Sequence, residues 1–240
     1  MEAQIINIQG VDITFFRSPK AKRLNITIKP FIGVRVSVPH SVSFKKAKKA
    51  TLERIDWIKS HLAKVQKTEE GFTVFNTDTK FKTRTHQLEI KVSDTNTLRS
   101  VVRNNKITVS IPKSSDIASV KVKVQIEIRK AIERAWRKEA KEYLPNRVKV
   151  LAAKHKFEYK NVSIKNAKTR WGSCSYENNI NLNLHLMRLP DHLVDYVILH
   201  ELVHTKVKNH GKDFWKLLDI VSGSARELDR EVKEYRLQIY

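Results

Sequence analysis

The sequence contains almost no cysteine and no long apolar run. Its one cysteine, Cys174, cannot form an internal disulfide, and a single thiol fits a reducing compartment. No apolar stretch approaches the length of a membrane-spanning helix, and the first residues, Met1 to Gln4, do not form a signal peptide. We therefore expect a soluble cytoplasmic protein that does not enter a membrane.

Acidic residues are scarce relative to basic ones. The 240 residues include 47 lysines and arginines but only 25 aspartates and glutamates, which gives a formal net charge of +22. Such an excess favours a polyanionic partner, such as nucleic acid (DNA or RNA) or a nucleotide. The lysines are spread along the chain rather than grouped, however, and a lysine-rich solvated surface explains them equally well. Both interpretations stay open.

The first part of the chain alternates between apolar and polar residues, as strands do. This pattern predicts strands within residues 4–16, 23–29 and 34–38. The last two form a predicted hairpin, which Pro39 ends. Ser43 is the predicted N-cap of one helix over residues 44–66.

A similar order of strands and a helix then recurs. Strands are predicted at residues 88–92, 98–103 and 106–111. Asn104-Asn105 suits the tight turn of the second hairpin. Ser110-Ile111-Pro112 repeats Ser37-Val38-Pro39, and a helix follows again, here over about 117–144. We interpret this as a diverged internal repeat, with coincidence as the alternative.

The second half reads as helices around short strands. Residues 146–155 are predicted to continue the long helix beyond Pro145, with a kink. A strand at 162–164 and a turn at 169–175 follow. Residues 179–186 alternate strictly, which predicts a strand whose odd-numbered residues, Asn181, Asn183 and His185, lie on its polar face. Further helices are predicted from Asp191 as N-cap, around residues 214–218, and over 224–237.

One of these helices carries the pattern H-E-x-x-H. Residues four apart lie on one face of a helix, so His200 and His204 can offer both imidazoles to one metal ion. Glu201 lies one step round, where it can act on a metal-activated water as general base. Zinc accepts neutral imidazole nitrogens, and a catalytic zinc ion has three protein ligands. The alternative is an ordinary amphipathic helix with two satisfied histidines.

His210 is the candidate third ligand. On a continuous helix it would lie about 240° round from His204 and face away. We therefore expect the helix to stop near Lys208, so that the chain can turn His210 back onto the metal. The histidine spacing equals that of the long metzincin motif, but Val207 stands where that motif has glycine.

Several of these segments together resemble the YgjP-like metallopeptidase family, which is related to the WLM and SprT-type zinc peptidases. They are Arg170-Trp171-Gly172-Ser173-Cys174, the asparagine-rich strand, residues 195–204, His210 with Phe214-Trp215, and Asp56-Trp57-Ile58. The resemblance covers nearly the whole chain and implies a zincin-like fold and a zinc-dependent hydrolase. In zincins, an edge strand beside the metal helix binds an extended peptide; residues 179–186 are the candidate, and a half-exposed structural strand is the alternative.

Together these features predict an α+β protein. A β-hairpin-rich region with one inserted helix, residues 1–115, precedes a zincin-like metallopeptidase domain, residues 116–240, with an H-E-x-x-H active-site helix. The expected activity is a zinc-dependent peptidase that acts on a peptide or protein. The alternative, which the family resemblance also implies, is a metal-dependent pyrophosphatase acting on a nucleoside triphosphate such as UTP. The oligomeric state stays open.

The residue that would stabilise an oxyanion is also open at this stage. Arg170, Tyr196 and His185 are candidates, although Tyr196 fits the core better and Arg170 could equally form a salt bridge. Cys174 is interpreted as a buried turn residue rather than a nucleophile.

Overall fold

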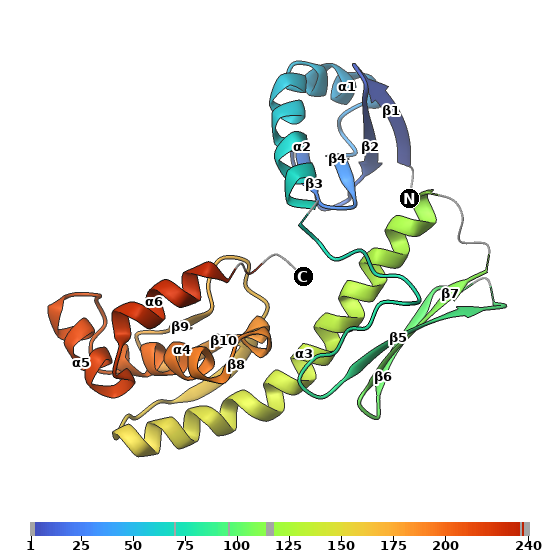
Figure 1. The fold of residues 1–240 in the computed structure, drawn as a ribbon. Coiled ribbons are helices and arrows are strands. Elements are labelled where there is room, and N and C mark those ends of the chain that lie inside the picture. The colour runs from blue at the N-terminus through green and yellow to red at the C-terminus, as the bar shows by residue number, and fades with distance from the viewer. Residues whose placement is uncertain (1–2, 70, 96, 114–117, 236, 238–240) are drawn as a thin grey trace. The chain divides into compact units, whose positions relative to one another are not determined.

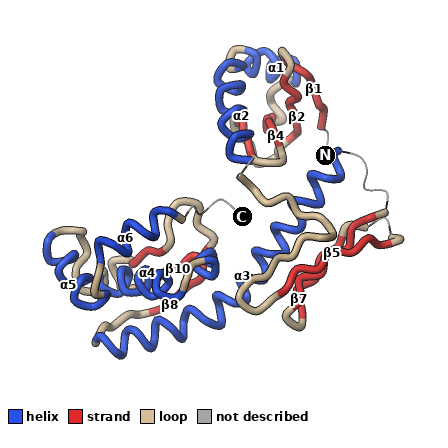
Figure 2. The backbone as a smooth tube through the Cα atoms, in the orientation of Figure 1, coloured by secondary structure: helices blue, strands red, loops and turns tan. Residues whose placement is uncertain are grey.

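Two compact units make up the chain. A computed structural model describes residues 3–69, 71–95, 97–113, 118–235 and 237. The first unit runs to Val74 and includes Ala118–Ile126; the second contains Phe75–Ile117 and Glu127–Ile239. The predicted domain boundary at 115/116 lies outside the described residues. Among those residues, six α-helices and three small sheets form a mixed α+β fold (Figures 1 and 2).

The first unit is a four-stranded sheet with two helices. Its strands are β1 (Ala3–Ile8), β2 (Val11–Arg17), β3 (Asn25–Lys29) and β4 (Gly33–Val38). They lie in the order β1-β2-β4-β3, with β2 parallel to β4 and the other pairs antiparallel. The predicted hairpin of β3 and β4 is therefore confirmed. The inward residues of β2 and β4, such as Phe15 and Val36, are fully buried and form the core with Ala47 and Ile58.

The single helix predicted over residues 44–66 is wrong, because the chain bends within it. The structure has α1 (Phe44–Leu52) and α2 (Ile55–Glu69) instead. The amide of Arg54 donates to the carbonyl of Thr51, which tightens the chain at this point. The predicted cap is confirmed, since the Ser43 hydroxyl accepts from the amide of Lys46.

A three-stranded sheet opens the second unit. It contains β5 (Gln87–Ser93), β6 (Arg99–Arg103) and β7 (Lys106–Pro112) in the order β5-β7-β6. Asn104 and Asn105 join β6 to β7 with φ angles of 51° and 55°, as a two-residue hairpin turn of the predicted kind requires. As in β2-β4-β3, the middle strand is parallel to one neighbour and antiparallel to the other. The internal repeat itself stays a prediction.

One long helix, α3 (Ala118–His155), continues through Pro145. A proline removes only one backbone donor, and the buried face of the helix extends on both sides of it, from Ile128 through Leu144 to Leu151. The predicted continuation over residues 146–155 is confirmed. The predicted start, at about residue 117, lies outside the described residues.

The rest of the second unit is a small sheet with helices. Its strands are β8 (Asn161–Lys165), β9 (Gly172–Cys174) and β10 (Asn179–Asn183), in the order β8-β10-β9. A 3-10 helix, η1 (Leu184–Arg188), leads to α4 (Asp191–Val203), α5 (Lys212–Ser222) and α6 (Ala225–Glu234). Residues 169–175, which were predicted as a turn, therefore contain a strand, β9, which pairs with β10.

The strand predicted over residues 179–186 ends earlier than expected. The Asn183 side chain accepts from the amide of His185, which turns the chain into η1. Its amide group also donates to the carbonyls of Ala167 and Arg170, so Asn183 is buried rather than outward-facing. His185 is buried as well. In addition, β10 is the middle strand of its sheet, so it cannot be the predicted edge strand.

None of the described helices combines the length and the apolar composition that crossing a membrane requires.

A buried carboxylate, Glu139, ties α3 to the segment before β5. One of its oxygens accepts from the hydroxyls of Thr83 and Thr85, the amide of Thr85 and Nδ1 of His86. Burial acts to raise the pKa of Glu139, but these hydrogen bonds outweigh it and hold the pKa below the ordinary carboxyl value. Glu139 is therefore ionised in the folded protein at neutral pH.

We expect Glu139→Gln to lower the free energy of unfolding by about 2 kcal/mol at pH 7, since it removes charge-assisted hydrogen bonds. The pKa of Glu139 is lowered by folding, so its stabilising contribution is present above the unfolded pKa of about 4.3 and disappears as the pH falls through the folded value. Urea unfolding should thus show the wild type and the variant converging in acid. The exposed neighbour Glu142, changed to Gln, is the matched control.

Candidate metal centre

The H-E-x-x-H residues lie at the end of α4. This helix is mostly buried, with His200 and Glu201 in its last turn and His204 as its C-cap. The prediction that the helix stops near Lys208 is wrong by about a turn, because it ends at Val203. The chain leaves through a tight turn in which the Thr205 hydroxyl donates to the carbonyl of Leu202.

Three imidazoles converge where the chain returns. Nε2 of His210 lies 3.0 Å from Nε2 of His200 and 3.2 Å from Nε2 of His204. One nitrogen from each ring lies within 4.8 Å of the others, and this is the one such group of metal-ligating side chains among the described residues. The ring of Phe214, on α5, packs against all three imidazoles at centroid distances of 4.5 to 4.9 Å.

The environment of the histidines favours neutral rings. Burial, together with the neighbouring His204 and His210, lowers the pKa of His200 to about 4. Burial also lowers the pKa of His204. Nδ1 of His204 lies 3.1 Å from the carbonyl of Val207, which places the proton on Nδ1 and leaves Nε2 with its lone pair toward His210. His210 is exposed, so the group is open to solvent on its side.

Glu201, which follows His200 in α4, is buried with one carboxylate oxygen unpaired. It is 5% exposed, and its Oε2 atom has no hydrogen-bond partner. Burial raises the pKa of Glu201 to about 8, and Arg170 partly offsets the rise. An unpaired buried oxygen is costly, and a bound water, ion or substrate group can supply the missing partner.

Gly172 of β9 makes room for this carboxylate. A Cβ atom at position 172 would lie 2.6 Å from Oε1 and 2.7 Å from Cγ of Glu201. No side chain other than hydrogen fits there unless Glu201 moves. The sequence analysis did not assign Gly172 the role of making room for Glu201. The feature that could have indicated it is the glycine within the Trp171-Gly172-Ser173-Cys174 segment.

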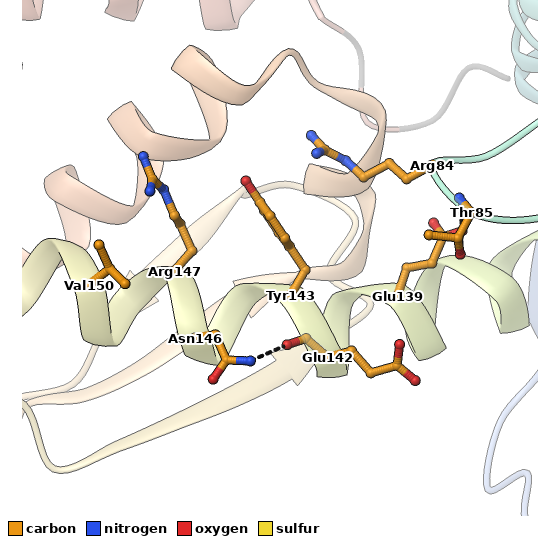
Figure 3. A pocket seen from close by; sticks show the side chains of 8 residues that line it. All are labelled: Arg84, Thr85, Glu139, Glu142, Tyr143, Asn146, Arg147 and Val150. Carbon is orange, nitrogen blue, oxygen red and sulfur yellow. Dashed lines mark hydrogen bonds between the residues drawn. The ribbon is translucent and has the colours of Figure 1, made fainter.

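Two ion pairs fix the start of α4. Figure 3 shows Tyr143 and Arg147 rising from α3 and Arg84 reaching in from the segment before β5, around a pocket of about 530 Å³. Arg84 forms an ion pair with Asp191, and Arg147 forms a bidentate ion pair with Asp195. Asp191 was predicted as the N-cap of this helix, but the N-cap is Pro190, and Asp191 lies in the first turn.

The three candidates for an oxyanion donor differ in position. The hydroxyl of Tyr196 is buried and donates to Asp229. His185, in η1, packs edge-on against Trp136 of α3. The Arg170 side chain is exposed, and its charge acts on Glu201. Cys174 is half-buried in β9, and burial raises the pKa of its thiol, so it is not an activated nucleophile.

The family model of the YgjP-like metallopeptidase domain matches residues 22–235. This match identifies the protein as a metal-dependent hydrolase. The chain belongs to the YgjP-like metallopeptidase family. The predicted resemblance is confirmed, and the family implies a divalent metal ion.

Two solved structures are similar to part of the chain. The metallopeptidase zymogen jannalysin of Methanocaldococcus jannaschii is 27% identical, with a TM-score of 0.34, over 38% of this chain and 93% of its own. The zymogen abylysin of Pyrococcus abyssi is 23% identical, with the same TM-score, over 38% of this chain and 92% of its own. No curated protein matches the chain.

Replacing Gly172 should disturb Glu201 specifically. We expect Gly172→Ala to displace the carboxylate, to cost about 1–3 kcal/mol of stability through overpacking, and to lower hydrolysis at unchanged metal content. Gly211→Ala is the matched control, because a Cβ at that position meets nothing within 4 Å and the residue has a negative φ of −74°. Equal activity of the two variants would remove the role assigned to Gly172.

Proposed function

We propose that the protein is a zinc-dependent peptidase in which His200, His204 and His210 hold the metal and Glu201 is the general base. The observation that carries the proposal is the convergence of three imidazole nitrogens beside a buried carboxylate with an unpaired oxygen. An all-imidazole set suits zinc, and three protein ligands leave a coordination position open for catalysis. A purely structural zinc site would normally have a fourth protein ligand.

The donor set fits a divalent metal ion. Rings with a lowered pKa are neutral at pH 7, as metal ligands must be. The hydrogen bond from Nδ1 of His204 to the Val207 carbonyl orients that ring and supports its other nitrogen as a ligand.

Zinc, when bound, supplies a Lewis acid that polarises a carbonyl group and makes water more acidic. Glu201 accepts the proton of the attacking water and passes it to the leaving amine of the cleaved peptide. Its pKa, raised by burial, falls when a cation is bound nearby, because opposite charge favours the carboxylate. Gly172 keeps Glu201 in place for both transfers.

The substrate strand is β9 rather than the predicted 179–186. Within the described part of the chain, β9 has a partner on one side only. The amide of Asn183 donates to the carbonyl of Trp171, and the amide of Ser175 donates to the carbonyl of Asn179. The backbone groups of Trp171 and Ser175, at the two ends of β9, therefore face β10. By alternation, Gly172 and Cys174 present their backbone groups to the free edge. An extended peptide can add there as a further strand.

Two lysines near the motif are already engaged, which reduces the positive charge available to a nucleoside triphosphate at the metal. A triphosphate site needs cations free to meet the phosphates. Of the basic residues near the motif, Lys208 donates to the Ser175 carbonyl and to Asn178, and Lys206 lies over the ring of Phe157. The pyrophosphatase alternative is tested by including nucleoside triphosphates in the activity assays.

Removing any one ligand should weaken zinc binding. We expect His200→Ala, His204→Ala and His210→Ala each to lower the zinc content at sub-saturating metal by about tenfold or more, since each removes one of three protein ligands. Elemental analysis of the folded variants measures this. Full zinc occupancy in the His210→Ala protein would rule out His210 as the third ligand. His192→Ala, an exposed histidine of the same helix, serves as the control.

Removing the base should separate binding from turnover. We expect Glu201→Gln to keep its zinc and to lose about 100-fold or more of the peptidase activity, because an amide cannot accept the proton. Steady-state cleavage of a quenched fluorescent peptide library, together with zinc analysis, measures both. A variant with wild-type activity would require another base.

A further inference from the structure

A second, basic pocket lies on the sheet that contains β9. It has a volume of about 230 Å³, and its polar lining consists of Lys165, Arg170, Trp171, Ser173, Asn181 and Asn183. No carboxylate lines it. Gly172, which contacts Glu201, also lines this pocket, but the other lining side chains have no role in the proposed zinc chemistry.

The strand register places four of the pocket's polar side chains, those of Lys165, Ser173, Asn181 and Asn183, on the face of the sheet opposite Glu201. Side chains alternate between the two faces of a strand, and Gly172 faces Glu201. Ser173, its neighbour in β9, therefore points to the other face, where its hydroxyl accepts from the side chain of Asn181 on β10. Lys165 extends this face, since it is in register with Asn183.

The two cations of the pocket are available to a ligand. Among the described residues, the side chains of Lys165 and Arg170 have no hydrogen bond or ion pair with a carboxylate. The backbone of Arg170 is nevertheless held, because its carbonyl accepts from the buried Asn183. The guanidinium thus projects from a fixed point, and its charge reaches Glu201.

We propose that this pocket receives a carboxylate of the peptide substrate, and that the enzyme prefers peptides with an acidic residue near the cleaved bond. This inference rests on the proposed peptidase function. A peptide added to the free edge of β9 places alternate side chains on the two faces of the sheet. Those on the face of Ser173 point over β9 toward the pocket, where Arg170 precedes β9 and Lys165 extends from β8 on the other side of β10. A guanidinium suits a carboxylate because it can donate two parallel hydrogen bonds.

The experiment compares matched peptides that carry Glu, Gln or Lys at each position around one cleavable bond. We expect the wild type to cleave the Glu peptide at one of these positions with a kcat/KM on the order of tenfold above that of the Gln peptide. Lys165→Gln and Arg170→Gln should each reduce the ratio of kcat/KM for the Glu peptide to that for the Gln peptide. A general effect of Arg170 on Glu201 changes both values equally and cancels in this ratio. Lys216→Gln, an exposed lysine of α5 outside the pocket, should leave the ratio unchanged.

A binding measurement gives a readout that does not depend on turnover. In the Glu201→Gln protein, fluorescence anisotropy should show tighter binding of the Glu peptide than of the Gln peptide, and Lys165→Glu should shift the preference toward the Lys peptide. Amidated and free-acid forms of each peptide distinguish the source of the carboxylate. A preference that survives amidation assigns a side chain, and one that disappears assigns the chain terminus.

The outcomes separate this inference from the function it rests on. Cleavage of Glu and Gln peptides with equal kcat/KM at every position overturns the pocket assignment and leaves the peptidase intact. A Glu preference that persists in the Lys165→Gln, Arg170→Gln double variant overturns it as well. If the zinc-loaded wild type cleaves no peptide of the set, the peptidase proposal itself fails.

Discussion

The arrangement of the site depends on where α4 ends. A helix rotates by 100° per residue, so a continuous helix would carry His210 away from the face that His200 and His204 share. The helix ends at Val203, and the turn after it uses the carbonyls of Leu202 and Val203 to satisfy its amides. The chain then needs only the short segment up to Gly211 to bring the third imidazole back. Phe214, in the first turn of the next helix, packs beneath all three rings.

The opposite end of α4 is held in another way. Arg84 and Arg147 pair with Asp191 and Asp195 in its first turns. Partly exposed ion pairs contribute little stability, typically about 1 kcal/mol or less each. The geometry of the Arg147–Asp195 pair matters more, because a bidentate guanidinium fixes both the rotation and the position of the carboxylate that it binds. We infer that the two pairs orient α4 on α3 and on the segment before β5, and thereby orient the histidines at its other end.

Local patterns in the sequence were sufficient for most elements but not for their partners. The Asn104-Asn105 turn, the Ser43 cap and the strands on either side of Gly10 follow from short-range chemistry, and the structure has all of them. The histidine group was predicted from its spacing, and the three rings do lie together. The parallel pairing of β2 with β4 could not be predicted, because it joins segments that are not adjacent in the chain.

Residues 179–186 show why alternation can mislead. Apolar residues at every second position predict a strand with one polar face, yet the last part of this segment is a buried 3-10 helix. Asn183 causes the change, since its side chain bonds to three backbone groups at once and needs burial to do so. A polar residue inside such a pattern looks the same in the sequence whether it faces solvent or binds the backbone.

The register of β9 determines what each face of its sheet can do. Side chains alternate along a strand, so a slip by one residue would turn the Ser173 side chain away from the basic pocket and toward Glu201. The slipped strand would press a side chain into the carboxylate, where even a Cβ does not fit. The Asn181–Ser173 hydrogen bond and the bond from the Asn183 amide to the Trp171 carbonyl hold β9 in its observed register. The asparagines of β10 therefore act on the candidate metal centre indirectly: they hold the glycine against Glu201, and in the same register the neighbouring side chains form the wall of the second pocket.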